Sequence, residues 1–101
     1  MIRLVTIYPW PSDPERFRRH FLERHLPLCR AIPGLTSCHY SFDVSKIEGP
    51  GQWFCIFEAQ FPDRATLEVV LTSPEAQRAA ADIPNYSPNT PTSLIYEAVA
   101  L

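Results

Sequence analysis

Strand-like and helix-like segments follow one another in a fixed order along this chain. Residues 2–8, 35–44, 53–61 and 94–99 are short runs rich in β-branched, aromatic and other apolar residues, as is typical of strands. A helical segment follows the first strand, and two shorter ones separate the third strand from the fourth. The order β-α-β-β-α-β is the split β-α-β pattern of ferredoxin-like folds. We therefore expect a single α+β domain over residues 1–101, with a four-stranded antiparallel sheet and helices on one face.

The first helix has a clear predicted beginning. In the stretch SDPE, Ser12 can cap the helix, and Pro14 suits its first turn. We expect the helix to end near His25, because Leu26 precedes a proline and is pushed away from helical angles. A further turn over residues 28–31 is compatible with the sequence.

The sheet is expected to need cover on both faces. Alternation along the third strand puts Trp53, Cys55 and Phe57 on one face, and Phe54 and Ile56 on the other. A strand that is apolar on both faces is typical of a sheet that is buried on both faces. One layer of helices covers only one face, so we expect a second copy of the chain to cover the other. The expected assembly is a twofold homodimer that packs sheet against sheet.

Two histidines lie five residues apart in FRRHFLERH. An advance of about 100° per residue places His25 in the apolar arc with Phe17 and Phe21, and His20 on another side. We therefore expect His25 to face the sheet and His20 to be solvated. An imidazole titrates near neutrality, which suits general acid or base catalysis. A buried imidazole can equally be a neutral packing group bonded to a backbone carbonyl, and the spacing leaves both roles open.

Aromatic side chains near strand ends are expected to surround His25. In a split β-α-β fold the cleft lies between the helices and the sheet, and such rings would form its apolar wall. Tyrosine hydroxyls there could orient a carbonyl or phenol oxygen of a small-molecule substrate. Each ring taken singly is more typical of core packing, so the hypothesis depends on their clustering. The predicted residues are His25 and Tyr8 for catalysis, and Phe21, Tyr40, Trp53, Tyr86 and Tyr96 for substrate binding.

Composition argues against several classes of partner and cofactor. The net charge is −2 and no basic run occurs, so we expect no nucleic-acid partner. No apolar run reaches the roughly 18 residues of a membrane span, and no signal peptide is visible, so we expect no membrane partner. The 3 cysteines form no C-x-x-C pair, which favours free thiols and a cytoplasmic location. Metal-ligand spacing and a Gly-rich phosphate loop are both missing, so neither a metal nor an organic cofactor is expected.

Two stretches of the chain resemble the signatures of a known family. YPWPSDPERFRRHFLERHLPLCRAIPGL resembles the opening of the EthD-like proteins, which share Y-P, D-P, a phenylalanine, H-x-P-L and P-G-L. SPEAQRAAADIPNY resembles the family's second signature, so the resemblance covers nearly the whole chain. It implies a dimeric α+β barrel. It also maps the family's helix histidine to His25, its tyrosine to Tyr8, and its late aspartate and asparagine to Asp82 and Asn85.

The resemblance also implies a role in small-molecule catabolism, such as the degradation of ethyl tert-butyl ether and other xenobiotics. We expect an enzyme in which His25 moves a proton beside the carbonyl of a small apolar or lactone-like substrate, isomerising, dehydrating or cyclising it. Two alternatives stay open. One is a non-catalytic binding or accessory protein of an oxygenase pathway, and the other is a cofactor-free monooxygenase.

Relatives often carry a tyrosine where this chain has Phe21. A hydroxyl needed there would come from Tyr8, Tyr40 or Tyr86.

Overall fold

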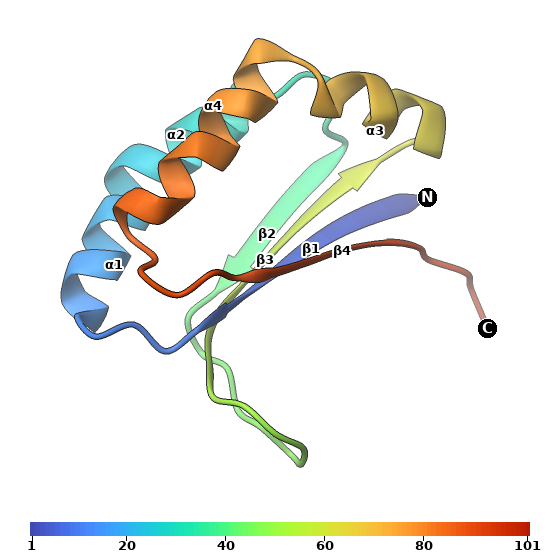
Figure 1. The fold of residues 1–101 in the computed structure, drawn as a ribbon. Helices are drawn as coiled ribbons and strands as arrows, with labels where there is room; N and C mark the ends of the chain where they lie inside the picture. The colour runs from blue at the N-terminus through green and yellow to red at the C-terminus, as the bar shows by residue number, and fades with distance from the viewer.

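The computed structural model describes all 101 residues and contains one antiparallel sheet with helices on one of its faces (Figure 1). The strands, in the spatial order β2-β3-β1-β4, are β1 (Ile2–Pro9), β2 (Ser37–Ser41), β3 (Trp53–Phe61) and β4 (Thr92–Glu97). The helices are α1 (Pro14–His20), the π-helix η1 (Phe21–His25), α2 (Leu26–Arg30), α3 (Arg64–Leu71), α4 (Pro74–Asp82) and the 3-10 helix η2 (Ile83–Asn85). All three strand pairs are antiparallel, so the predicted ferredoxin-like α+β fold is confirmed.

The helix layer brings the two halves of the chain together above the sheet. In Figure 1, α4 runs beside the continuous segment formed by α1, η1 and α2, while α3 lies at one end of the layer. The end of α4 and the helix η2 therefore lie next to the π-helix, although about 60 residues separate them in the sequence. None of the helices combines the length and the apolar character needed to cross a lipid bilayer.

Side chains at the helix N-termini satisfy backbone N–H groups that have no partner within the helix. At α1 the cap is Asp13 and not Ser12 as predicted, because the Asp13 carboxylate accepts a hydrogen bond from the N–H of Arg16 at 3.1 Å. The helices α3 and α4 are capped in the same way by Asp63 and Ser73. The proline in the first turn of α1 follows directly after its cap, as helix-start chemistry favours.

The first helix continues past its predicted end. Leu26 keeps helical angles (φ −58°, ψ −41°) although it precedes a proline, and α2 runs on to Arg30. The π-helix explains the difference, since the N–H of Leu26 bonds to the carbonyl of Phe21, five residues back, instead of four. A proline ring in a regular helix clashes with the carbonyl four residues earlier. The wider π-helical turn relieves that clash before Pro27.

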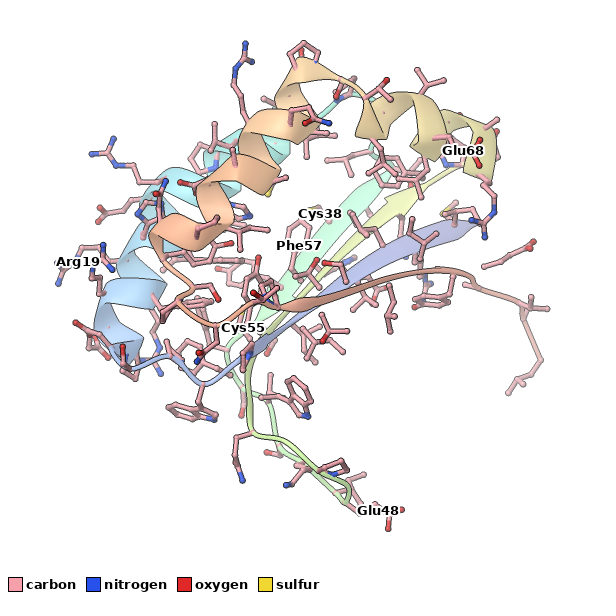
Figure 2. The ribbon with its side chains drawn as sticks, in the orientation of Figure 1. Arg19, Cys38, Glu48, Cys55, Phe57 and Glu68 are labelled. Carbon is pink, nitrogen blue, oxygen red and sulfur yellow. The ribbon has the colours of Figure 1, made fainter.

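Aromatic rings fill the space between the sheet and the helices. Phe17 and Phe21 are fully buried, and their rings stack with centroids 6.0 Å apart. Tyr8 from β1 and Tyr86 from the segment after η2 meet these rings edge-on. Phe57 points from β3 toward the helices in Figure 2. The core is therefore an aromatic cluster contributed by both halves of the chain.

A β-bulge turns one core ring to an unexpected side of the sheet. Tyr8 pairs with Cys55, and the next residue of β1, Pro9, pairs with Trp53. Phe54 therefore has no partner on β1 and is the extra residue of the bulge. Phe54 therefore faces the helices together with Cys55, and its ring lies 5.0 Å from that of Phe17. The prediction that strict alternation sends Phe54 to the opposite face is wrong for this reason.

The face of the sheet away from the helices has an apolar centre and a polar edge. The apolar side chains on this face are Val5, Ile7, Ile56 and Leu94. Beside them, Arg3 Nε lies 3.3 Å from Glu58 Oε1, and the Tyr96 hydroxyl lies 3.4 Å from each of these side chains. Because Phe54 turns inward, β3 contributes less apolar surface to this face than predicted. Most of the apolar side chains on this face come from β1 and β4.

Candidate active site

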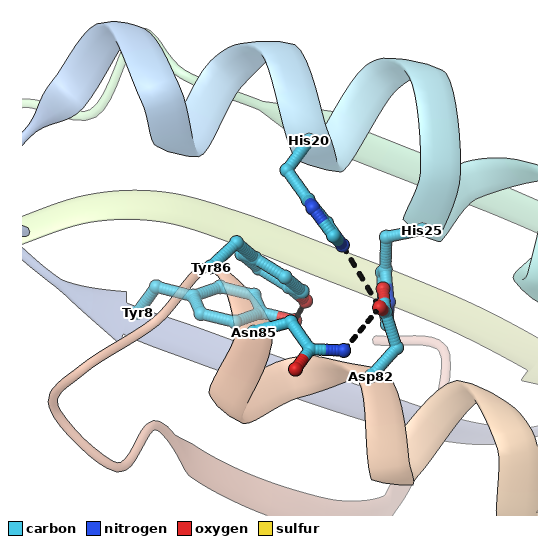
Figure 3. Close-up of polar contacts among 6 residues, drawn as sticks. All are labelled: Tyr8, His20, His25, Asp82, Asn85 and Tyr86. Atoms are coloured by element: carbon cyan, nitrogen blue, oxygen red, sulfur yellow. Dashed lines mark hydrogen bonds and ion pairs between the residues drawn. The ribbon is translucent and has the colours of Figure 1, made fainter.

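One buried carboxylate at the end of α4 receives three side-chain hydrogen bonds (Figure 3). Asp82 Oδ1 accepts from His20 Nε2 at 2.8 Å and from Asn85 Nδ2 at 3.1 Å, and Asp82 Oδ2 accepts from His25 Nδ1 at 3.0 Å. Burial raises the pKa of Asp82, but the three donors outweigh it and hold the pKa below its ordinary value of 3.8. Asp82 is therefore ionised at neutral pH and fixes both imidazole rings.

The π-helix allows two histidines five residues apart to reach the same carboxylate. In a regular α-helix such positions are rotated by roughly 140° from each other, which is why His20 is expected in solvent. In the structure the His20 side chain is only 24% exposed, bonds to Asp82, and stacks on Tyr86 with ring centroids 5.3 Å apart. The prediction that His20 is solvated is wrong, because a turn with i→i+5 hydrogen bonds brings the two rings to one side.

His25 faces inward, as the sequence predicts, and is only 3% exposed. Its Nδ1–H donates to the ionised Asp82, which leaves Nε2 without a proton and able to accept one. Nε2 has no hydrogen-bond partner in the protein, yet no fully buried side-chain nitrogen or oxygen is unpaired, so Nε2 keeps access to open space. Burial lowers the pKa of His25, and the bond to Asp82 only partly offsets this. His25 is therefore a neutral base at neutral pH.

Two tyrosine hydroxyls form a second buried polar contact close to His25. The Tyr8 and Tyr86 oxygens lie 2.7 Å apart, and the Tyr86 ring centroid lies 4.9 Å from that of His25. Burial raises the pKa of both phenols well above the ordinary value of 10.0, so both stay protonated. Two hydroxyls have two protons and their mutual bond uses one of them. One O–H therefore remains to donate to a third group.

A cavity of about 230 Å³ lies between β1, β4 and the helices. His25 and Tyr8 are on its wall, and most of the remaining lining is apolar. Such a space, mainly apolar with a few polar groups that converge on it, is typical of a small-molecule site. The lining residues that matter below are Thr6, Tyr8, His25, Cys29, Ala80 and Ser93.

The five predicted substrate-binding residues all lie outside the wall of this cavity. The Phe21 ring contacts those of His25 and Tyr40, with ring centroids 5.5 Å from each. Trp53 begins β3 beyond the bulge, and Tyr96 lies on the face of the sheet away from the helices. Tyr86 contacts Tyr8 and His25, and the role of all five residues in substrate binding stays a prediction.

Sequence reasoning missed the link between Asp82 and the two histidines. The family signature marks Asp82 and Asn85, but it assigns them no partner. The spacing of His20 and His25, with Pro27 just after them, was the one visible sign of an irregular helix. No three histidine, cysteine, aspartate or glutamate side chains are placed to hold a metal ion.

Comparison with known proteins agrees with this geometry at the level of fold and family. No family model matches the chain. An uncharacterized 11.0 kDa protein from the thcB-thcC intergenic region of Rhodococcus erythropolis is 30% identical over 94 residues, which cover 93% of this chain and 91% of that protein. A dimeric ferredoxin-like protein of unknown function from Thermobifida fusca shares the fold, with a TM-score of 0.71, 16% identity and coverage of 96% and 90% of the two chains.

A crystal structure of an ethyl tert-butyl ether D (EthD) family protein from Bacillus halodurans is more similar in fold than the Thermobifida fusca protein. The TM-score is 0.89 and the identity is 25%, with 98% of this chain and 99% of that chain covered. Both the fold and the sequence relationship extend over nearly the full length, as the two sequence signatures predict. The chain belongs to the EthD-like family.

Proposed function

We propose that this protein is a cofactor-independent enzyme of small-molecule catabolism in which His25 is the general base. The observation that supports it best is the orientation of one ring. Nδ1 of His25 is held by Asp82, while Nε2 has no protein partner and the ring lines a cavity of about 230 Å³. The substrate class that fits is a small, mostly apolar carbonyl or lactone-like molecule, and the reaction class is isomerisation, dehydration or cyclisation.

The first step transfers a proton from a carbon beside the substrate carbonyl to Nε2 of His25. The electron pair of the broken C–H bond moves toward the carbonyl oxygen, which becomes an enolate. When Tyr86 donates to Tyr8, the O–H of Tyr8 stays free and donates to such an oxygen, because Tyr8 lines the same cavity. The imidazolium then returns the proton to another carbon in isomerisation, or to a departing hydroxyl in dehydration.

Asp82 is a positioning residue in this proposal. Its carboxylate selects the tautomer of His25 that has a bare Nε2, and it stabilises the imidazolium that forms when Nε2 takes the proton. The contacts of Asp82 with His20 and Asn85 hold the carboxylate in place. The lowered pKa of His25 keeps the ring unprotonated before substrate arrives, as a base requires.

A titration of His25 followed by NMR tests whether this ring meets a ligand. We expect small neutral ketones and lactones to shift the His25 ring resonances and to change its pKa, because a bound carbonyl compound occupies the space in front of Nε2. The exposed His39 provides an internal reference that should not respond. If no such compound perturbs His25 while the protein stays folded, the ring is a packing group and the proposal fails.

The two alternatives give different results in the same setting. A binding or accessory protein would hold the ligand and shift His25, but would catalyse no proton exchange on it. A cofactor-free monooxygenase would consume oxygen with an electron-rich phenol, which an oxygen electrode measures directly.

A cytoplasmic location stays part of the proposal, and 3 free cysteines, of which Cys29 and Cys55 are buried, are compatible with a reducing compartment.

We also propose that two copies pair through the bare face of the sheet. Val5, Ile7, Ile56 and Leu94 form the centre of that face, and Leu94 is 52% exposed in the single chain. An exposed apolar patch on a sheet is typical of a protein–protein contact. A twofold axis through this patch would bring each patch against its own copy.

Replacement of Leu94 by lysine is therefore expected to separate the two copies, because it buries a charge in an apolar contact. Light scattering after size-exclusion chromatography should give twice the chain mass of 11.5 kDa before the change and the single chain mass after it. The matched control is Leu22→Lys, at a leucine that is 42% exposed on the π-helix. A single-chain mass for the unmodified protein would contradict this assembly.

A further inference from the structure

Two hydroxyls line the sheet side of the His25 cavity and form a polar contact that the proposed reaction does not use. Thr6 on β1 and Ser93 on β4 are paired across the strands, with their oxygens 3.0 Å apart. Thr6 is buried, with 6% of its surface exposed, while Ser93 is exposed. Their mutual hydrogen bond uses one of the two hydroxyl protons. One O–H and several lone pairs therefore remain for a ligand.

The same pair lies where the cavity reaches the surface. A shallower hollow under the loop between η2 and β4 shares Ala80, Ile83 and Ser93 with the His25 cavity. Ala80 and Ser93 are exposed, whereas His25 and Tyr8 are buried. The two hollows therefore adjoin between α4 and β4, and His25 and Tyr8 lie at the buried side of the cavity.

No lysine, arginine, aspartate or glutamate side chain lines this cavity. The remaining groups that could carry a charge are Tyr8, His25 and Cys29. Burial raises the pKa of the Cys29 thiol to about 12, and Tyr8 and His25 are neutral for the reasons given above. A charged ligand would lose its hydration here without a counter-charge, whereas a neutral ligand would not.

The volume sets the size of the occupant. A dry cavity of about 150 Å³ in another protein holds benzene, so about 230 Å³ has room for roughly nine non-hydrogen atoms. This is the size of a benzene ring with one short substituent. The apolar wall suits such a body, and the hydroxyl pair supplies a hydrogen-bonding position apart from the base.

We infer that the cavity takes an uncharged molecule of about nine non-hydrogen atoms, and that the Thr6–Ser93 hydroxyl pair is its second hydrogen-bonding anchor, distinct from His25. This inference rests on the proposed function in one respect only, namely that the end of the molecule next to His25 is the end that reacts. The hydroxyl pair is a specificity determinant and takes no part in proton transfer.

Three probes of equal size test the inference. Acetophenone, benzoate and cumene have the same number of non-hydrogen atoms, but they are respectively a neutral ketone, an anion and a hydrocarbon. NMR titrations of the unmodified protein should show binding of acetophenone and cumene and none of benzoate. Benzoate binding as tight as that of acetophenone, or no binding of either neutral probe, would overturn the inference.

Two variants test the anchor itself. Thr6→Val and Ser93→Ala should each raise the Kd of 4-acetylpyridine about two- to tenfold, the effect of one lost neutral hydrogen bond, because its ring nitrogen is a second acceptor apart from the carbonyl. Both variants should leave the Kd of acetophenone, which has the carbonyl alone, unchanged. Thr92→Val is the matched control, because Thr92 neighbours Ser93 on β4 and faces the other way. Equal weakening of both probes would show that the hydroxyls only pack, and would refute the anchor.

The outcomes also separate this inference from the proposed function. Anchor-dependent binding of 4-acetylpyridine without any proton exchange would leave the ligand class standing and remove His25 as a base. Exchange that continues unchanged in Thr6→Val and Ser93→Ala, with an unchanged Kd of 4-acetylpyridine, would leave the base standing and remove the anchor.

Discussion

Replacement of His25 by asparagine is expected to slow proton exchange on a bound ketone by about 10²- to 10⁴-fold, the usual contribution of a positioned general base. Asparagine can still donate its amide N–H to Asp82, but it has no nitrogen that accepts a proton. In D₂O, a base in front of a ketone replaces the C–H hydrogens beside the carbonyl with deuterium. NMR or mass spectrometry measures this replacement directly, with acetophenone as the probe.

The matched control for this prediction is His39→Asn. His39 is exposed on β2 and pairs with Glu58 on β3, on the face of the sheet away from the helices. Its loss should leave the exchange rate unchanged, whereas a general effect of any histidine would lower the rate in both variants. Equal exchange by the unmodified protein and His25→Asn, with acetophenone binding retained in both, would refute the role of His25.

The pH profile adds a second readout of the same base. Because burial lowers the pKa of His25 below 6.5, the neutral form persists on the acid side of that value. The exchange rate should therefore hold down to a pH below 6.5 and fall only as the ring becomes protonated. A rate that already halves above pH 6.5 would point to a different base.

The strand and helix order could be predicted from the sequence because local patterns determine it. The apolar stretch around Phe57 and the prolines that bound the helices act over a few residues, and the fold follows from their succession. The prediction that His25 faces the sheet has the same basis, because it follows from the spacing of His25 to Phe17 and Phe21. These features need no knowledge of which distant segments meet.

The site could be predicted only in part because its geometry depends on departures from regular structure. The rotation of His20 toward Asp82 requires one π-helical turn, and the inward side of Phe54 requires one bulge. Helical and strand periods describe only the regular case, so each irregularity moves a side chain that the pattern had placed elsewhere. The contact between His25 and Asp82 joins residues 57 positions apart, which no local pattern reports.

Replacement of Asp82 by asparagine is expected to lower the free energy of unfolding by about 2–3 kcal/mol at neutral pH, because it removes an ionised acceptor from a buried polar network. An asparagine amide offers one oxygen where the carboxylate offers two, and its NH₂ group would face a donor. Urea unfolding at pH 7 measures the change. Asp13→Asn is the matched control, since asparagine caps a helix about as well as aspartate, and its effect should stay within about 0.5 kcal/mol.

The pH dependence of this loss follows from the two pKa values. The folded state lowers the pKa of Asp82, so its stabilisation is complete above the unfolded value of 3.8 and disappears as the pH falls through the folded value. The contribution of the Asp82 carboxylate to the difference between the unmodified protein and Asp82→Asn should therefore be constant above pH 3.8 and shrink below it. A difference that vanishes already at pH 5 would mean that another group supplies the stability.

His25 affects the same measurement at higher pH. The folded state lowers its pKa below 6.5, so the unfolded chain binds a proton first, and the unmodified protein loses stability as the pH falls below 6.5. The bond to Asp82 opposes this shift, so Asp82→Asn lowers the pKa of His25 further. The variant should then lose stability over a wider pH range below 6.5, by at most about 1.4 kcal/mol per pH unit for the single proton. A pH profile of the variant that parallels that of the unmodified protein over the whole range below pH 6.5 would show that Asp82 does not govern the charge of His25, and the proposed base would lose its partner.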